Sequence, residues 1–367
     1  MAEARWVTDP QPFADLEPFW NDLLARCENP NPFLSWDWAA AWWRHLGAGE
    51  LNCLTLWRGA DLEALAPVYR AAGPWGLRTL RLLGSGQADY LDFLVRQGHG
   101  DELYAELLAK LWAPADCDLA YLEQVPGARL ERLRAQARAS GAYLQIKPRG
   151  HCYTAALPAR WEDYLATLGS NDRYNIGRRT RALERQHDVV FRRITAPGAE
   201  LERQVERFFT LMVQRLEMRG RQLALPAERS LAFHRELAQR FARRGWLNLC
   251  LLERRGEPIA TLFVFEYGRT LYYYHSGFDP DWSKYSVGTV LLAKCIQDGI
   301  ARGLREFDFT RGRAAYKAKW QVQERAYYRV ALARSGWSHL RFLGHGAWRR
   351  LARNCRRARS APAAVEE

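Results

Sequence analysis

Residues 247–320 read LNLCLLERRGEPIATLFVFEYGRTLYYYHSGFDPDWSKYSVGTVLLAKCIQDGIARGLREFDFTRGRAAYKAKW, and this stretch decides the fold. Runs rich in β-branched and aromatic residues at 247–252, 258–265 and 271–275 predict three strands joined by turns that contain glycine. A helix is predicted at 286–302 and a further strand at 305–310. Because a helix that crosses between two strands implies that they are parallel, the sequence predicts a mixed sheet.

Gly288 lies in the first turn of that helix, although glycine is costly inside a helix. The first turn of a helix presents free N–H groups and the positive end of the helix dipole, and both favour a bound anion. Close approach of a phosphate to the backbone therefore explains the glycine, and packing against a strand is the alternative. An apolar stripe predicts that the helix packs on the sheet: Val287, Leu291, Leu292, Cys295, Ile296 and Ile300.

The strand after the helix has one polar face. Glu306, Asp308 and Thr310 alternate with two phenylalanines, so the three polar side chains share a face. A crossover strand is normally apolar on both faces. The polar face therefore predicts either an exposed sheet edge or a cleft where two strands separate. In such a cleft a carboxylate can take a proton from an attacking amine.

The order of these elements resembles the core of the GNAT acyltransferases. Four short motifs resemble those of the CelD-type acetyltransferases, which are relatives of the Fem-type transferases with two GNAT units. These motifs are GFDP at 277–280, YSVGT at 285–289, RGLREFD at 302–308 and RGRAAYKAKW at 311–320. The resemblance is strong over 160–325 and weaker over 30–125. It implies that the helix mouth holds the pyrophosphate of coenzyme A and that the separated strands hold the thioester.

The predicted fold is an α/β protein with an α+β mixed sheet, built from tandem GNAT-like acyltransferase units. A chain of 367 residues suits two domains. We expect an N-terminal unit at 1–150, a C-terminal unit with the donor site at 151–335 and a basic tail at 336–367. The first half repeats the hairpin–strand–helix–strand order of the second, which indicates an internal duplication.

The resemblance implies roles for residues around the predicted cleft. Asp308 is the expected proton acceptor. His275, whose unperturbed pKa of about 6.5 suits proton transfer, is the second candidate, and a core histidine is the alternative. Tyr316 is expected to protonate the departing thiolate. Tyr272 and Tyr274 are expected on the strand face opposite His275. The expected coenzyme A contacts are Lys284, Tyr285, Ser286, Val287, Gly288 and Thr289; Tyr285 stands where the usual pyrophosphate pattern begins with Gln or Arg.

The acceptor side is predicted from charged residues. Arg178 and Arg181 share a helix face and suit an anionic substrate, although a solvated face is the alternative. Lys317 suits a phosphate or a carboxylate. Asp89 and Asp92 interrupt an apolar region and are expected to reach across the domain joint toward the acceptor amine.

Composition limits the other classes of site. The seven scattered cysteines form no CxxC pair and no HExxH occurs, so no metal site is predicted. Dispersed cysteines suit a reducing cytosol. No signal peptide and no apolar run of about 18 residues are found. A cytoplasmic protein is expected, and the net charge of +13 suits a phosphate-rich partner.

The predicted function is N-acyl transfer from acetyl-CoA or another acyl-CoA to an amine of a small molecule or a sugar or envelope precursor, by direct attack. The resemblance associates it with polysaccharide biosynthesis and the cell envelope. Two alternatives stay open: a Fem-type transferase that uses aminoacyl-tRNA, and a non-catalytic GNAT-fold binding module. The tail combines aromatic residues with arginines such as Arg349 and Arg350. We expect it to touch an anionic membrane at the inner face or, alternatively, to pack on the second unit.

Overall fold

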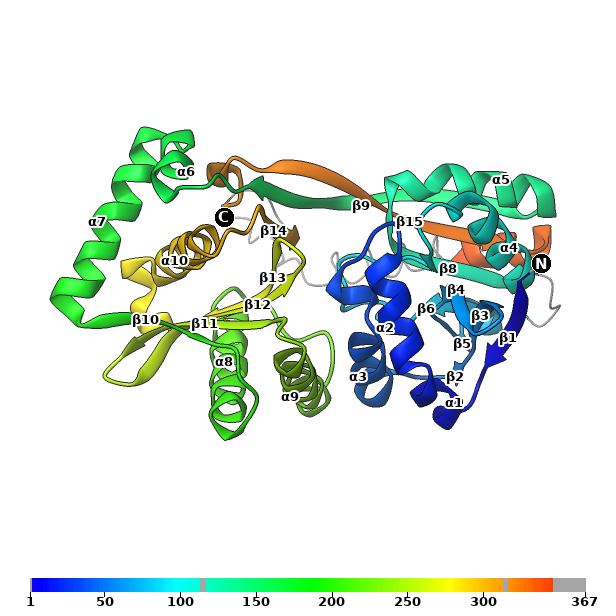
Figure 1. The fold of residues 1–367 in the computed structure, drawn as a ribbon, viewed down its shortest axis with the longest axis horizontal. Coiled ribbons are helices and arrows are strands. Elements are labelled where there is room, and N and C mark those ends of the chain that lie inside the picture. The colour runs from blue at the N-terminus through cyan, green and yellow to red at the C-terminus, as the bar shows by residue number, and fades with distance from the viewer. Residues whose placement is uncertain (1, 113–116, 313–315, 346–367) are drawn as a thin grey trace, which may run out of the picture.

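The structure is a computed structural model that describes residues 2–112, 117–312 and 316–345. It has two lobes lying side by side, joined along one edge by two long strands (Figure 1). The first lobe contains β1 (Glu3–Val7), α1 (Pro10–Asp15), α2 (Glu17–Arg26), α3 (Trp36–Leu46), β2 (Glu50–Leu51), β3 (Cys53–Arg58), β4 (Asp61–Ala66), β5 (Val68–Ala72), β6 (Arg78–Leu82), β7 (Leu94–Val95), α4 (Gly100–Trp112), β8 (Leu119–Pro126) and α5 (Leu130–Ser140).

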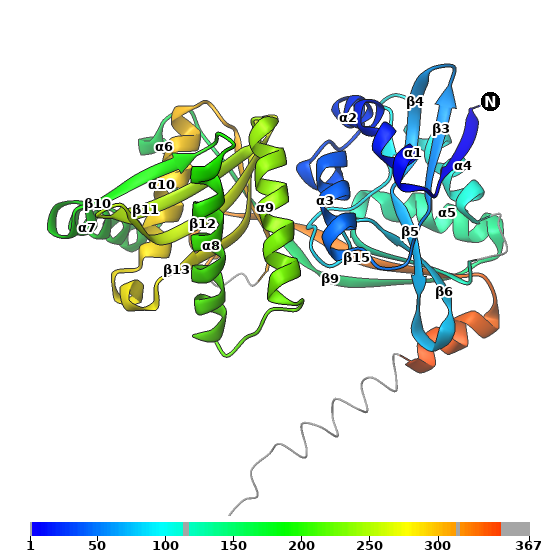
Figure 2. The same cartoon turned by 90° about the horizontal axis from the view of Figure 1, so that it is seen from below.

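The second lobe follows the strand β9 (Tyr143–Ala156). It contains α6 (Trp161–Thr167), α7 (Ser170–His187), β10 (Val189–Ile194), α8 (Ala199–Glu217), α9 (Ala227–Arg243), β11 (Leu247–Arg254), β12 (Glu257–Tyr267), β13 (Thr270–Phe278), α10 (Val287–Ala301) and β14 (Glu306–Arg311), and β15 (Gln323–Ala333) returns to the first lobe. Helices α6, α7 and α10 cover one face of its sheet, and α8 and α9 cover the other (Figures 1 and 2).

One mixed sheet of eleven strands runs through both lobes in the order β10-β11-β12-β13-β14-β9-β15-β8-β6-β5-β2. Within it, β13 pairs in parallel with β14, and β6 pairs in parallel with β8. Each parallel pair is connected through a helix, α10 and α4 respectively. The mixed sheet predicted from the sequence is therefore confirmed, and the two lobes repeat the same strand–helix–strand unit.

The strand β9 crosses the proposed domain boundary at residue 150 without a break. Its first part pairs with β15, and its last part pairs with both β15 and β14. The strand β15, which the sequence did not single out, pairs with β8 as well as with β9. The chain thus leaves the first lobe along β9 and returns to it along β15, so the two units share one edge.

Glycines set how closely the helices of the second lobe lie on its sheet. A Cβ added to Gly277 of β13 would lie 2.4 Å from the backbone nitrogen of Met212, so α8 rests directly on the strand backbone. A Cβ added to Gly299 of α10 would lie 2.6 Å from Leu271 Cδ1 on the other face. The predicted apolar stripe of α10 is buried throughout, which confirms its packing on the sheet.

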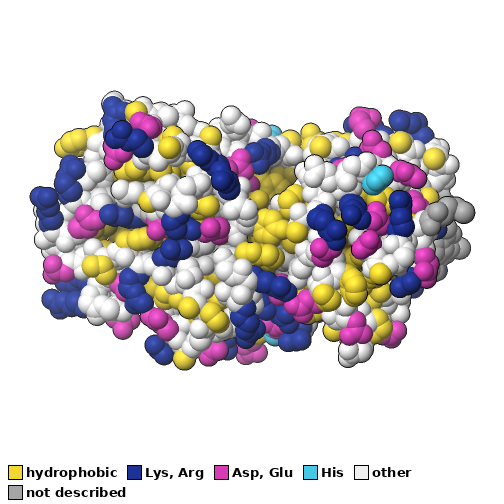
Figure 3. All heavy atoms as spheres, in the orientation of Figure 1, with side chains coloured by type: hydrophobic (Ala, Val, Ile, Leu, Met, Phe, Trp, Pro, Cys, Tyr) yellow, Lys and Arg dark blue, Asp and Glu magenta, His cyan; other side chains and the backbone are white. Residues whose placement is uncertain are grey.

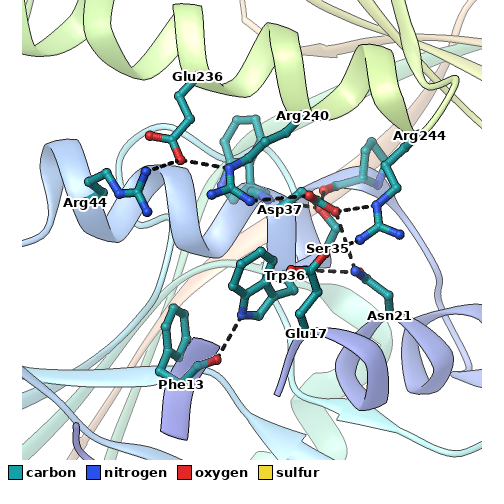
Figure 4. A network of polar contacts seen from close by, with 12 residues as sticks. Phe13, Glu17, Asn21, Ser35, Trp36, Asp37, Arg44, Glu236, Arg240 and Arg244 are labelled. Carbon is teal, nitrogen blue, oxygen red and sulfur yellow. Dashed lines mark hydrogen bonds and ion pairs between the residues drawn. The ribbon is translucent and has the colours of Figure 1, made fainter. Parts of the chain in front are cut away.

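The lobes are also joined where α3 of the first lobe meets α9 of the second (Figure 4). Asp37 of α3 accepts a hydrogen bond from Arg244 Nε at 2.9 Å and lies 3.7 Å from Arg240 Nη1. Glu236 of α9 pairs with Arg44 at 3.0 Å. Aromatic rings of Phe33 and Trp38 from the first lobe pack on Tyr274, and they belong to one continuous apolar core with α8 and α9.

The described start of the C-terminal tail, residues 336–345, is helical and packs on the first lobe rather than on the second. Phe342 contacts the ring of Tyr121, and His339 stacks on Tyr143. Trp337 and Leu340 are exposed. The rest of the tail, including the predicted anchors Trp348 and Leu351, lies outside the described residues. Across the described ranges, no helix is both long enough and apolar enough to cross a membrane.

Candidate active site

A cleft opens where β13 and β14 separate. The two strands pair only from Thr270 to Tyr272 against Glu306 to Asp308, and then diverge. Thr310 has a φ of +53°, which turns β14 away from its partner. Its hydroxyl donates to Tyr273 O at 2.7 Å and spans the opening. Because β14 lies between β13 and β9, its polar face is not at an exposed edge of the sheet.

One end of the cleft is the N-terminus of α10. Ser286 precedes the helix in a left-handed conformation and makes no side-chain cap, and the first turn contains no acidic residue. Gly288 is exposed, and a Cβ there would meet only the Phe278 ring, at 3.7 Å. The chain's own packing therefore does not require glycine at this position. An open helix mouth with no carboxylate in it is the arrangement that attracts an anion.

The cleft encloses about 820 Å³ of atom-free space, part of it open to solvent. Its walls come from both faces of the sheet. Ser286, Val287, Gly288 and Thr289 line it from the α10 side, as the sequence predicted, and Arg215 and Arg219 line it from the α8 side. The cleft therefore passes between the separated strands from one face to the other.

Two predicted coenzyme A contacts lie outside this cleft. The ring of Tyr285 packs against His187 at 4.6 Å and Trp282 at 5.3 Å. Lys284 is exposed, with its Nζ 5.1 Å from the Tyr285 ring. Both residues belong to the short 3₁₀ helix before α10, Pro280–Tyr285, and the Tyr285 ring lies against His187 at the end of α7. These two expectations are therefore corrected.

A basic group that the sequence did not single out stands at the helix mouth instead. Lys319 Nζ donates to Thr289 Oγ1 at 3.4 Å. Burial lowers the pKa of Lys319, Asp172 opposes that shift, and Arg179 adds to it. The helix α7 thus brings Arg179 near the α10 mouth, whereas the predicted pair Arg178 and Arg181 is exposed on its surface. A run of four arginines alone does not indicate which one faces inward.

Asp308 is buried beside the separation of the strands, at 1 % exposure. Tyr90 from the first lobe donates its O–H to Asp308 Oδ2 at 2.6 Å, and Thr310 N–H donates to Oδ1 at 2.6 Å. Burial raises the pKa of Asp308 to about 7, the two hydrogen bonds oppose the rise, and Asp89 and Glu306 add to it. A carboxyl with this pKa can both accept and release a proton near neutral pH.

Asp89 reaches across the joint between the lobes, but it pairs with a residue of the second lobe and not with the predicted acceptor amine. Its Oδ1 lies 2.8 Å from Arg311 Nε of β14.

Lys317 is buried and donates to the backbone carbonyls of Phe309, Thr310 and Arg311 at 2.8, 2.9 and 3.0 Å. All three N–H donors of its ammonium are used in this way. Lys317 therefore holds the irregular end of β14, in place of the predicted substrate phosphate or carboxylate.

Asp92 lies inside the first lobe, away from the cleft. It accepts a hydrogen bond from Arg129 Nε at 2.5 Å and one from Tyr104 O–H at 3.2 Å. Arg129 also pairs with Glu28. This buried network ties together elements of one lobe, so the expected contact of Asp92 with the acceptor is corrected. No sequence pattern separates Asp92 from Asp89, because the two differ only in tertiary partners.

His275 shares a strand face with Tyr274, contrary to the predicted opposite faces. A bulge in β13 inserts Tyr274 between the residues paired with Phe263 and Val264, so the alternation of faces is lost there. The rings of His275 and Tyr274 are 4.0 Å apart, and His234 lies 5.6 Å from His275. Burial, and then His234 and nearby arginines, hold the pKa of His275 well below its usual range. The imidazole is therefore neutral at pH 7.

Tyr316 lines the cleft opposite the α10 mouth. Burial and the neighbouring Tyr273 raise the pKa of its phenol. Tyr316 thus keeps its proton at neutral pH, and its O–H is available to donate. Tyr273 in turn hydrogen-bonds Ser276 Oγ at 2.5 Å. Hydroxyl groups therefore face the two arginines across the cleft.

The corresponding helix mouth in the first lobe is filled. Helix α4 begins at Gly100, where an added Cβ would lie 1.6 Å from Glu28 Oε1. Asp101 and Glu102 add two acidic residues to its first turn. These carboxylates occupy the position that is open at the N-terminus of α10. The first lobe repeats the fold, but only the second lobe has an open mouth.

Comparisons with known proteins agree with this geometry. The family model described as "Acetyltransferase (GNAT) domain" matches residues 170–318. The structure of FemX superposes with a TM-score of 0.61 at 11% identity, covering 89% of this chain and 96% of that one. The C-terminal DUF2156 domain of a proposed lysylphosphatidylglycerol synthetase from Agrobacterium fabrum gives 0.56 at 11% identity, covering 91% and 96%. The L-PGS structure from Bacillus licheniformis gives 0.52 at 13% identity, covering 88% and 97%.

At these identities the structural likeness concerns the fold alone, and no curated protein matches the sequence. The family match covers the segment that contains the open α10 mouth and the separated strands. Residues 170–318 are thus similar to a GNAT acetyltransferase domain, and the fold of the whole chain is similar to that of FemX.

Proposed function

We propose that this chain transfers an acyl group from acyl-CoA to an amine in the cleft between β13 and β14. The observation that carries the proposal is the course of the cleft. It starts at an uncapped helix mouth without carboxylates and runs along the end of β13, past the point where β13 diverges from β14. At that point β14 carries a buried carboxyl, Asp308, whose pKa is about 7. The pyrophosphate of coenzyme A fits the mouth, with Lys319 beside it, and the thioester fits the separation of the strands.

The chemistry is direct attack. The amine nitrogen forms a bond to the thioester carbonyl carbon, the C–S bond breaks, and coenzyme A leaves as a thiolate. Asp308 takes the proton released by the amine, relayed through the Tyr90 hydroxyl that it holds at 2.6 Å or through water. Tyr316 donates a proton to the thiolate and is reprotonated from solvent. Positioning of the two reactants in one cleft supplies much of the remaining rate.

His275 is the alternative proton acceptor. It is only partly buried, and its low pKa keeps it neutral and able to accept a proton at pH 7. The two candidates differ in their pH dependence. With Asp308 as the base, activity rises through about pH 7, whereas with His275 the rise is complete well below that pH.

A second candidate function is transfer from aminoacyl-tRNA. The FemX-like fold and the net charge of +13 support it. Binding of tRNA would weaken steeply with salt, because phosphate contacts release counterions.

The resemblance of residues 277–320 to the CelD-type acetyltransferases supports acyl-CoA as the donor. It also supports an acceptor from polysaccharide or cell-envelope biosynthesis and a cytoplasmic location. A chain that binds neither donor would be a binding module.

The test is calorimetric titration with acetyl-CoA and, separately, with aminoacyl-tRNA at 50 and 200 mM salt. Acetyl-CoA binding that Gly288→Val removes from a folded protein is the expected result. Tight tRNA binding that falls with salt, without acetyl-CoA binding, would favour the second function. Binding of acetyl-CoA without thiol release from any amine would favour the binding module.

A further inference from the structure

The α8 side of the cleft is positively charged. Arg215 lies in the last turn of α8, and Arg219 lies in the turn that follows the end of the helix at Glu217. Both side chains line the cleft. Gly277 is the reason that they reach it. Without a Cβ at that position, the backbone of α8 rests on β13 at Leu211 and Met212, directly before the two arginines.

Neither arginine has a carboxylate partner within the ranges that the structure describes. Arg215 donates from Nη1 to the carbonyl of Ser276 at 3.2 Å and lies 5.7 Å from the Phe278 ring. Its Nε is sealed from solvent and has no hydrogen-bond partner among the described residues. A buried donor without a partner is costly, so an acceptor supplied by a ligand would lower the free energy of the site.

Arg219 experiences repulsion from its neighbours. Its side chain is exposed on the solvent side, but its partial burial lowers its pKa, and the positive charges of Arg215 and Arg221 add to that shift. Most arginines around the lobe joint are paired with carboxylates, as Arg244 and Arg311 are. Arginines that crowd one another at the wall of a cleft favour the binding of an anion between them.

Hydroxyl groups complete this wall. Tyr273, Ser276 and Tyr316 line the same cleft, and a hydroxyl can donate to an anionic oxygen. Two guanidinium groups with adjacent hydroxyls match a carboxylate or a phosphate, whose oxygens accept several charge-assisted hydrogen bonds at once. The α10 mouth, which suits the pyrophosphate of the donor, lies on the other face of the sheet. The anion at α8 is therefore a second one.

We infer that the acceptor amine also carries an anionic oxygen group, a carboxylate or a phosphate, which binds between Arg215 and Arg219 at the α8 side of the cleft. This inference rests on the proposed acyl transfer and names the substrate class of the same site. Neutral amines would lack the contact that orients the attacking nitrogen toward the thioester.

The kinetic test uses acceptor pairs that differ in the anion. Glycine is compared with glycinamide, and glucosamine 6-phosphate with glucosamine, with acetyl-CoA as donor and thiol release as the readout. The variants are Arg219→Gln and, as a control, Arg203→Gln in α8, which is exposed and does not line the cleft. We expect one anionic acceptor to be preferred by kcat/KM. Arg219→Gln should raise its KM about tenfold, with kcat little changed, as expected for one lost charge-assisted contact.

Equal use of both members of each pair, or a preference that survives Arg219→Gln, would overturn the inference and leave the proposed transfer intact. The pair that responds distinguishes a carboxylate from a phosphate. A loss of preference in Arg203→Gln as well would indicate a general effect of charge and would also overturn it.

A binding measurement decides the question if none of the four acceptors reacts. Melting temperatures are measured with phosphate, malonate or chloride at equal ionic strength, for the wild type, Arg219→Gln and Gly288→Val. Stabilisation by phosphate or malonate that Arg219→Gln loses and Gly288→Val keeps would support the anion site at α8. Equal stabilisation of wild type and Arg219→Gln would overturn it. Failure of acetyl-CoA to bind would count against the proposed function alone.

Discussion

At the scale of single residues, the chemistry depends on Asp308, whose burial keeps its carboxyl protonated up to about pH 7. We predict that Asp308→Asn lowers kcat at pH 8 by at least about tenfold, since general base catalysis contributes about 10²–10⁴ in rate. The affinity for the donor should change little. The wild-type rate should rise with pH through about 7, and the variant should lack that rise. Full activity in the variant would make Asp308 structural and His275 the next candidate.

The same substitution has an opposite effect on stability. Asp308 binds its proton more tightly in the folded state than in the unfolded state, because its pKa rises from 3.8 to about 7 on folding. Between these pH values the folded state holds more protons, so the wild type loses stability as pH increases. We predict that Asp308→Asn has a higher melting temperature than wild type at pH 8 and no such advantage at pH 4. Thermal unfolding at both pH values checks this sign.

Gly288 is the residue on which donor binding depends. We predict that Gly288→Val abolishes acetyl-CoA binding and leaves the fold intact, because the β-branched side chain would stand between a phosphate and the helix N–H groups. Gly288→Ala is the matched control: its Cβ meets only the Phe278 ring at an ordinary contact distance. Calorimetry with both variants, alongside circular dichroism, measures the difference. Wild-type affinity in a folded Val variant would remove the pyrophosphate from the α10 mouth.

At the scale of elements, the irregular end of β14 creates the cleft, and Lys317 holds it in place. The carbonyls of three successive residues, Phe309, Thr310 and Arg311, accept its three N–H groups. Lys317→Met keeps the length of the side chain but leaves these acceptors unpaired, at about 1–3 kcal/mol for each buried group. We predict a loss of several kcal/mol in the free energy of unfolding and a loss of donor binding, measured by urea titration and calorimetry.

Lys319→Met is the control for this variant, since it removes a neighbouring ammonium that donates to Thr289 Oγ1 and lies over the Trp320 ring but holds no backbone carbonyl. Its stability should stay close to that of wild type, while its affinity for acetyl-CoA falls. Equal stability of the two variants would mean that Lys317 does not support β14.

At the scale of the whole molecule, the lobes are joined by shared strands, a continuous core and the contacts of α3 with α9. Apolar side chains also reach the surface along the waist between the lobes (Figure 3). Asp37 is almost completely buried and lies against Arg244 and Arg240. Removing one partner of a buried ion pair typically costs about 3–5 kcal/mol when the remaining charge is left uncompensated. Because Arg244 keeps Glu17 and Arg240 keeps Glu236 as partners, we predict that Asp37→Ala lowers the free energy of unfolding by less than this, about 1.5–3 kcal/mol.

Glu17→Ala provides the matched control for Asp37→Ala. Glu17 pairs with the same Arg244, but in a solvent-exposed position, where an ion pair contributes about 0–1 kcal/mol. Urea unfolding of both variants compares them. Similar costs for the two would show that the lobes do not depend on the buried carboxylate.

The tail gives a prediction at the same scale. Trp337 and Leu340 are exposed on the helix 336–345, whose other side packs on the first lobe. We expect the full chain to sediment with anionic liposomes at low salt and a chain ending at Ser335 to do so less, because basic residues near such a surface contribute about 1 kcal/mol each. Equal sedimentation would exclude lipid binding by the tail. A loss of stability on truncation would reflect the packing of Phe342.

Much of the fold could be predicted from local patterns. The strands at 247–275 and 305–310, the apolar stripe of α10 and the parallel pair β13–β14 depend on residues close in the chain. The anion site at the helix mouth was predicted from Gly288 in the first turn of the helix. Such features depend on the periodicity and charge of one segment, and both can be read directly from the sequence.

The roles of the polar side chains were decided by contacts between segments that are distant in the chain. The sequence alone determined a mixed sheet with an open helix mouth at Gly288 and a carboxyl on the next strand. Only the tertiary structure decided that Glu28 fills the corresponding helix N-terminus in the first lobe and that Tyr90 binds Asp308. It also decided that Lys317 donates its hydrogen bonds to backbone carbonyls and that Arg219 lines the cleft. The physical reason is that a polar side chain takes its role from the partners that burial leaves within hydrogen-bond distance, and those partners come from far along the chain.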